Sequence, residues 1–226
     1  MSDPKAFANF PIWTFYECSE SEIIYNAEDL INVNPGQITK LGFAATRGEA
    51  VASKVTVWIE NTDDEEITSK AFHSTDLMQK VYEENITLPT FPNTPTDPQY
   101  WEFEFAQPFN YTGGGIRVHV SSESSTYCMT ALNFVHDGTE LSKPTGKSNA
   151  LRRKGLANWG SASFYNPERA FPIIKLTMSQ DTPTGIVTPV VNETKEVTYY
   201  NVYGQKVAAD TKGLVISSEG KKFINK

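Results

Sequence analysis

The chain has 226 residues, of which 12% are aromatic, and its 14 glycines and 13 prolines fall mostly between apolar runs. This composition is typical of short strands joined by many turns, in one large β domain or in one domain with a small appendage. The formal net charge of −7 argues against a nucleic-acid partner, because no basic stripe is available to release counterions from a phosphate backbone. No apolar run approaches the roughly 20 residues of a membrane span.

Alternating apolar and polar residues predict a series of short strands before residue 178. In chain order, these are residues 10–16, 22–26, 38–45, 54–60, 79–83, 101–105, 116–120, 127–135, 149–154 and 171–178. Helical periodicity is almost absent, and turns rich in glycine, proline and polar residues separate the runs. We therefore expect an all-β fold, and this number of strands predicts a β-sandwich.

Residues 54–60 form the clearest single strand, with Val55, Val57 and Ile59 pointing one way. Trp58 lies on the opposite, polar face of this strand. There it either packs against a loop or a second sheet, or offers an exposed platform for stacking. The sequence leaves both interpretations open.

The stretch YWEFEFAQPFNYTGGGIRVHV, residues 100–120, has an apolar residue at every second position in each half. It predicts two half-buried strands joined by a glycine-rich connection. The polar positions between the apolar ones are Glu102, Glu104, Arg117 and His119, and we expect all four side chains to face solvent.

Motifs of catalysis and metal binding are missing from the sequence. His73, His119 and His136 occur in no HExxH, HxH or GxSxG context, and no elbow turn offers a nucleophile. The acidic run 63–66 lacks the alternating ligands and the glycine of an EF-hand, so we expect a solvated loop. The basic run 152–154 is expected to be a solvated strand end. We therefore predict no enzyme activity for the chain alone, no metal and no cofactor.

Two features bear on the cellular compartment. Cys18 and Cys128 lie far apart in sequence, so they form a disulfide only if the fold brings their strands together. Free, partly buried thiols are our first expectation, because a core of this size is stable without a disulfide. The opening MSDPKAF lacks the basic and apolar regions of a signal peptide. Either the protein is cytoplasmic, or an export signal has been removed ahead of Met1.

The amino-acid composition of the sequence changes after Met178. Residues 179–193, SQDTPTGIVTPVVNE, have the composition of a linker. Residues 194–226 predict a small β domain of three short strands, with turns at Gly204, 212–213 and 219–220. We therefore divide the chain into a sandwich over residues 1–178, a linker, and this tail.

The span from Phe10 to Met178 resembles the jelly-roll β-sandwich modules of Bacteroidetes surface and secreted proteins, which are related to cleaved-adhesin domains. The resemblance is carried by the order and spacing of FYECSESEIIYNAEDL, GQITKLGF, VTVWIEN, VYEENITLP, the WEFEFAQPFNYTGGGIRVHV hairpin and FPIIKLTM. It covers about three quarters of the chain and implies a jelly-roll-like antiparallel sandwich.

The tail YYNVYGQKVAADTKGLVISSEGKKFINK is similar to the C-terminal sorting domains of the type IX secretion system. The positions in register are Asn201, Gly204, Gln205, Val207, Lys212, Gly213, Ile216, Gly220, Lys221 and Lys222. The departures from the pattern are the pair 217–218 and the ending 225–226. This resemblance implies a secreted or outer-surface protein that is exported with the help of the secretion machinery.

The leading hypothesis is a non-catalytic extracellular module that binds a glycan or a host or bacterial surface protein. Sugars are held by flat aromatic faces with a few polar groups nearby. The residues chosen on this basis are Trp58, Trp159 and Tyr165 for stacking, and Asn158 and Arg169 for hydrogen bonds. Two alternatives are a structural stalk or accessory domain of a larger surface protein, and a domain that accompanies a catalytic one.

Overall fold

The computed structural model describes residues 5–7, 10–94, 96–136, 148–156, 158–179, 199–201, 205–209, 211–217 and 222–225. The chain divides into two compact units, Met1–Asp181 and Thr182–Lys226. Apart from Ser179, the predicted linker 179–193 lies outside the described residues. No α-helix occurs in the described part of the chain, which is built from strands and two short 3-10 turns.

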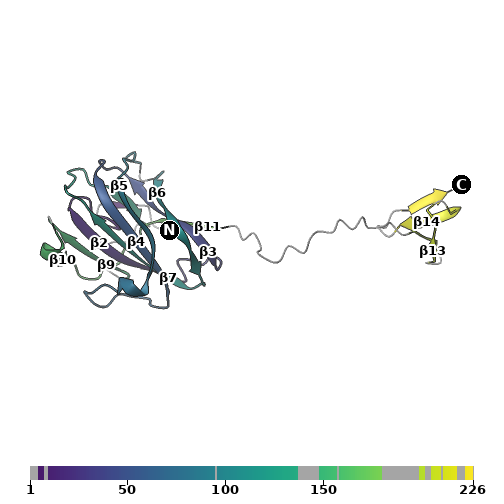
Figure 1. Cartoon of the computed structure of the whole chain (residues 1–226), viewed down its shortest axis with the longest axis horizontal. Coiled ribbons are helices and arrows are strands. Elements are labelled where there is room, and N and C mark those ends of the chain that lie inside the picture. Colours follow the sequence, from purple (N-terminus) through teal and green to yellow (C-terminus); the bar gives the residue numbers. More distant parts are fainter. Residues whose placement is uncertain are drawn as a thin grey trace. The chain divides into compact units, whose positions relative to one another are not determined.

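The first unit contains a six-stranded sheet with the strand order β10–β9–β2–β7–β4–β5 (Figure 1). Its members are β2 (Cys18–Tyr25), β4 (Ala52–Thr62), β5 (Gln79–Thr87), β7 (Gly115–Glu123), β9 (Ala150–Gly155) and β10 (Ser163–Phe164). Each neighbouring pair is antiparallel. β7 therefore lies near the middle of this sheet, hydrogen-bonded to β2 on one side and to β4 on the other.

A five-stranded sheet packs against the first one. Its members are β1 (Lys5–Phe7), β3 (Gly36–Thr46), β6 (Gln99–Tyr111), β8 (Asn133–His136) and β11 (Ile174–Met178). β3 pairs with β6 along one edge, and with β11 and then β8 along the other; β1 pairs with β8. All these pairs are antiparallel, so the predicted fold class, an all-β antiparallel sandwich, is confirmed.

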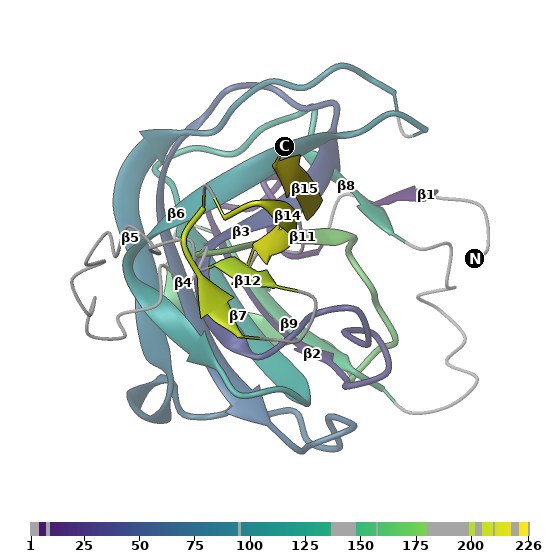
Figure 2. The same cartoon turned by 90° about the vertical axis from the view of Figure 1, so that its right-hand side faces the viewer.

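The chain crosses from one sheet to the other at every connection between described strands of this unit except β4–β5 and β9–β10. β6 and β7, expected to form a hairpin, are correctly located as strands but belong to different sheets. The period-two pattern is the same in both arrangements, because it requires only that each strand bury one face. β5 and β6 close one edge of the sandwich, where they lie side by side (Figure 2). There the Gln79 side-chain amide donates hydrogen bonds to the carbonyl oxygens of Gln107 and Pro108.

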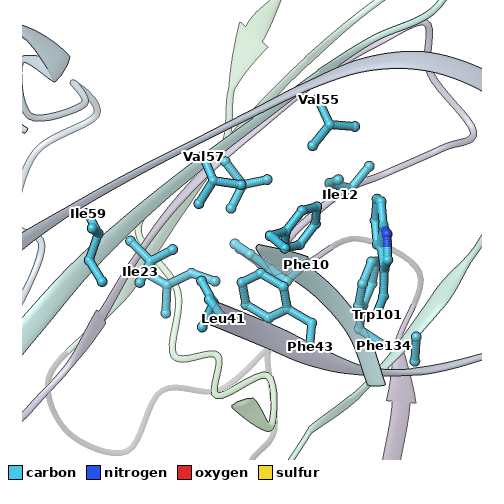
Figure 3. Packing of buried hydrophobic residues seen from close by; sticks show 14 of the residues in the cluster. Phe10, Ile12, Ile23, Leu41, Phe43, Val55, Val57, Ile59, Trp101 and Phe134 are labelled. Carbon is cyan, nitrogen blue, oxygen red and sulfur yellow. The ribbon is translucent and has the colours of Figure 1, made fainter. Parts of the chain in front are cut away.

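The core lies between the two sheets. Figure 3 shows Val55 and Val57 of β4 on one side, facing Leu41 and Phe43 of β3 on the other, with Phe10 among them. All five side chains are fully buried. The inward face predicted for residues 54–60 is therefore confirmed.

The structure differs from the predicted strands 10–16, 22–26 and 127–135. Residues 10–16 bury Phe10 and Ile12 but form turns rather than a strand. β2 begins at Cys18, four residues before the predicted strand 22–26, because residues 18–21 pair with β7 and with β9 at the same time. The strand predicted over residues 127–135 is limited to β8, since the backbone before it bonds to a loop.

The two cysteines are both free and buried. Burial is the main reason why the pKa of each thiol is raised.

The second unit contains a sheet with the order β13–β12–β14–β15. Its members are β12 (Tyr199–Asn201), β13 (Lys206–Val207), β14 (Gly213–Ser217) and β15 (Lys222–Asn225). The described residues of the tail form four strands, whereas three were predicted, and Gly213 begins a strand instead of forming a turn.

The buried aromatic core predicts a large cost for removing one ring. Phe43→Ala should lower the free energy of unfolding by about 3–5 kcal/mol, because the surrounding sheets cannot collapse into the space left by the ring. Tyr100→Ala is the matched control, since this ring is 39% exposed, and it should change stability by no more than about 0.5 kcal/mol. Urea denaturation measures both. Equal losses in the two variants would contradict this placement of the core.

Candidate functional site

The outer face of the six-stranded sheet carries the largest concentration of charged groups with little exposure to solvent in the described structure. Arg117 and His119 project from β7 away from the core, as the sequence predicts, but their exposed fractions are only 5% and 1%. The expectation that these two side chains are solvated is therefore wrong. Glu102 and Glu104 of β6, by contrast, are exposed as predicted.

A segment after β4 explains why this face is buried. Residues 63–74, which we call the flap, run from β4 to the 3-10 turn η1 (Thr75–Leu77) and cover the middle of the sheet. Ile67 of the flap packs against Ile24 and Leu151 in a small apolar cluster separate from the main core. This apolar contact fixes the flap over β2 and β9.

The flap also contributes charge to the face beneath it. Asp64 forms an ion pair with Arg117, whose guanidinium contacts Glu60 of β4 as well. The Nε of Arg117 lies 3.4 Å from Glu22 Oε1, on β2. One guanidinium thus meets three carboxylates from three elements. The acidic run 63–66 is exposed as expected for a solvated loop, but Asp64 also serves this pair.

His119 lies between two carboxylates of β2. Its Nε2 is 2.8 Å from Glu20 Oε1, and its Nδ1 is 3.7 Å from Glu22 Oε2. Burial disfavours the charged imidazole, but the interactions with Glu20 and Glu22 outweigh burial and raise the pKa of His119. The imidazole is therefore held in its charged form to higher pH than usual.

Glu20 is held as a carboxylate by two cations. It accepts hydrogen bonds from His119 and from the guanidinium of Arg153 on β9, with the Arg153 Nε at 3.0 Å. Burial acts to raise the pKa of Glu20, but these hydrogen bonds and charges prevail and lower it.

The flap closes over the charged cluster with His73. The His73 backbone N–H donates to Glu22 Oε2 at 2.7 Å, and its Nε2 lies 3.4 Å from Glu60 Oε1. A cavity of about 270 Å³ remains here, lined by Glu22 and Arg117 on the sheet side and otherwise by flap residues. No group of three or more His, Cys, Asp or Glu side chains that could hold a metal ion is found within the described residues.

Four half-buried aromatic rings lie beside this charged cluster. Trp58 of β4 is 5.3 Å from the His119 ring, and Phe72 of the flap lies 4.8 Å from the same ring. Phe72 is in turn 4.9 Å from Phe164 of β10. Trp159, in the 3-10 turn η2 (Trp159–Ser161), lies 4.7 Å from the Arg153 guanidinium. We call Trp58, Phe72, Phe164 and Trp159 the aromatic strip.

The structure brings only some of the predicted site residues together. Trp58 and Trp159 share the outer face, and Asn158 is exposed next to Trp159. Tyr165 lies on the other side of β9, 3.9 Å from the Arg152 guanidinium. Arg169 lies beside the Phe171 ring in the connection to β11, at 5.4 Å. Tyr165 and Arg169 are therefore not placed with the two tryptophans on the strip.

The basic run 152–154 is not the solvated strand end that the sequence indicates. The Arg152 guanidinium lies 4.7 Å from the Trp13 ring, and Lys154 Nζ lies 3.9 Å from the Tyr16 ring. Arg153 contacts the strip on the opposite face. Alternation along β9 sends the middle cation to one face and its two neighbours to the other.

Sequence reasoning missed Phe72, Phe164, Glu20 and Arg153 as members of this site. A signal for the flap is nevertheless present. Ile67 and Phe72 are isolated apolar residues in the otherwise polar stretch DDEEITSKAFHS, and such residues often mark a loop that packs back on the fold.

Comparison with protein-family models, with curated proteins and with solved structures finds no match for this chain. No helix in the described ranges has the length and apolar character needed to cross a membrane.

The charged groups around Arg117 predict that replacing it with a neutral residue strongly lowers the stability of the fold. Arg117→Met should lower the free energy of unfolding by about 3–5 kcal/mol, because Glu22 would stay buried, and Glu60 partly buried, without their cation. The double variant Arg117→Met/Glu22→Gln should recover part of this loss. Lys40→Met is the matched control, since it removes an exposed ion pair with Glu104, and should leave the urea midpoint unchanged. A similar loss for both single variants would contradict the assignment.

The lowered pKa of Glu20 predicts how its contribution depends on pH. In the unfolded chain the carboxyl titrates near its ordinary value of 4.5, and in the folded protein below it. The stability lost in Glu20→Gln should therefore be fully present above that value, and should vanish as the pH falls through the folded pKa. Urea denaturation of both proteins over about pH 3 to pH 7 measures the difference. A difference that grows toward acid pH would contradict the ion pairs described for Glu20.

Proposed function

We propose that the protein is a non-catalytic extracellular binding module whose outer sheet face holds a short oligosaccharide. The observation that carries this proposal is the placement of Trp58 and Trp159 on one face, with Phe72 and Phe164 between them. Flat aromatic faces are suited to the apolar faces of sugar rings.

The extent of the strip favours an oligosaccharide over a single sugar. Trp58 belongs to β4, and Arg153, which contacts Trp159, belongs to β9. β4 and β9 are three strand spacings apart in the sheet order, which corresponds to roughly 14 Å. A ligand that contacts both tryptophans must therefore have several rings in a row.

Polar groups for sugar hydroxyls are available beside the rings. The Arg153 side chain is 27% exposed and is hydrogen-bonded to Glu20, which holds it in place. A group that is ordered before binding costs less conformational entropy when the ligand arrives. The carboxylates of Glu20 and Glu22 are tied into ion pairs, which suits fixed hydrogen bonding better than proton transfer during catalysis.

We further propose that the protein acts outside the cytoplasm. Support comes from the resemblance of its first unit to jelly-roll modules of Bacteroidetes surface proteins. The tail adds the sequence similarity to type IX sorting domains, and its four-stranded sheet is a separate unit suited to be read by the secretion machinery. The ligand would then be a glycan of a host or bacterial surface.

The proposal predicts that the two tryptophans are needed for sugar binding. A glycan array probed with the purified chain should give a reproducible oligosaccharide hit. Trp58→Ala and Trp159→Ala should each weaken that hit by at least about tenfold, which corresponds to roughly 1.4 kcal/mol of stacking energy.

Tyr100→Ala is the matched control, because it removes an exposed ring from the other sheet, and it should bind like the wild type. Near-UV circular dichroism checks that each variant is folded. Absence of any glycan hit, with binding to a surface protein instead, would overturn the sugar proposal in favour of protein adhesion. Absence of both would favour a structural stalk or accessory domain.

A further inference from the structure

We propose that the flap, residues 63–74, is a pH-sensitive latch, which is fastened to the six-stranded sheet while His119 is charged and loosens when His119 loses its proton. The inference concerns the attachment of the flap. It does not depend on whether the aromatic strip binds sugars.

Several attachments of the flap end on groups of the charged cluster, while hydrogen bonds from Asn26 to the Glu65 carbonyl and from the Ile67 N–H to the Ser148 carbonyl lie outside it. The Asp64 carboxylate pairs with Arg117, and the His73 N–H donates to Glu22. The Phe72 ring contacts the His119 ring in an edge-to-face arrangement, with an interplanar angle of 79°. Ile67 supplies the main apolar attachment, and its N–H donates to a backbone carbonyl at 2.6 Å. The charge state of the cluster therefore acts directly on the contacts of Asp64, Phe72 and His73, which are part of what holds the flap.

Charged and titratable groups face His119 from every element packed around it. They are Glu20 and Glu22 of β2, Glu60 of β4, Arg117 of β7, Arg153 of β9, and Asp64 and His73 of the flap. The two guanidinium groups balance only two of the four carboxylates. The only other groups of this set that can carry a positive charge are the two imidazoles, and His119 is the more buried of the two.

Glu22 transmits the loss of charge to the flap. Its Oε2 is shared, because it accepts the His73 N–H at 2.7 Å and lies 3.7 Å from His119 Nδ1. When neutral His119 keeps its Nε2 proton on Glu20, the lone pair of Nδ1 faces Glu22 Oε2 and repels it. Glu22 is only 2% exposed, so loss of a neighbouring cation costs this carboxylate more than it would cost one in bulk water. The carboxylate is then drawn toward Arg117, away from the His73 amide.

The direction of the effect follows from the titration of His119. Burial opposes its charge, but Glu20 and Glu22 raise its pKa above the ordinary value of 6.5 in the folded protein. The stabilising contribution is fully present below that ordinary value, and is lost as the pH rises through the folded pKa. The latch is therefore closed on the acid side and loosens on the alkaline side.

Hydrogen exchange tests the latch in the full chain. Protection of the Ile67 and His73 amides should fall as the pH rises from about 6 to about 9, after correction for base-catalysed exchange, because opening exposes them. Protection of the Val57 amide in β4 should stay unchanged. An NMR titration of the His119 ring should have its midpoint above about 6.5 and coincide with the loss of flap protection.

Two substitutions separate the role of His119 from general destabilisation. His119→Gln keeps a donor for Glu20 but carries no charge, so the flap should be poorly protected at every pH in this range. His73→Gln is the matched control, because it keeps the backbone N–H that bonds to Glu22, and it should retain the pH dependence.

Three results would overturn the latch. The first is flap protection that stays constant while His119 titrates, and the second is a parallel loss of protection in the flap and in β4. The third is an unchanged pH dependence in His119→Gln. The first two come from the wild-type protein, so they decide the question even if His119→Gln does not fold.

Discussion

The structure depends on the need to balance the charge of Arg117 within a nearly dry layer. β7 lies near the middle of the six-stranded sheet and is buried on both faces, with Val118 in the core and Arg117 under the flap. A guanidinium in this position must have carboxylates around it, and β2, β4 and the flap each supply one. The sandwich is therefore partly a three-layer structure, in which charge pairing joins the six-stranded sheet to the flap much as apolar packing joins the two sheets.

Much of the fold was predictable, because period-two alternation identifies which residues of a strand point inward. The predicted strands 38–45, 54–60, 79–83, 101–105 and 116–120 all lie within β3 to β7. The same alternation does not say which strand is the neighbour, and so β6 and β7 could not be assigned to separate sheets. Nor does it say whether a polar face meets water or a covering loop. The burial of His119 depends on Ile67 and Phe72, whose positions are set by tertiary contacts.

The candidate site was partly predictable for a related reason. Trp58 stood out as an aromatic residue on a polar strand face, and Trp159 as an aromatic residue in a polar loop. That both reach one surface depends on the strand order from β4 to β9, which no local pattern encodes. Tyr165 follows Trp159 closely in sequence but packs on Arg152, because consecutive side chains of β9 point to opposite faces. Closeness in sequence was therefore a poor guide to closeness in space at this edge of the sheet.

The alternation of cations along β9 has a consequence for how this strand is held in register. A slip by one residue in one direction would place Arg153 in the aromatic contacts of Arg152 and Lys154 beside Glu20, so a cation would still occupy each position. The arginines thus cannot specify the alignment by themselves. That task falls to the ends of the strand. The Asn149 side chain bonds to the backbone of Ile24 and Ala170, and Gly155 sits where an added Cβ would come within 2.6 Å of a backbone oxygen.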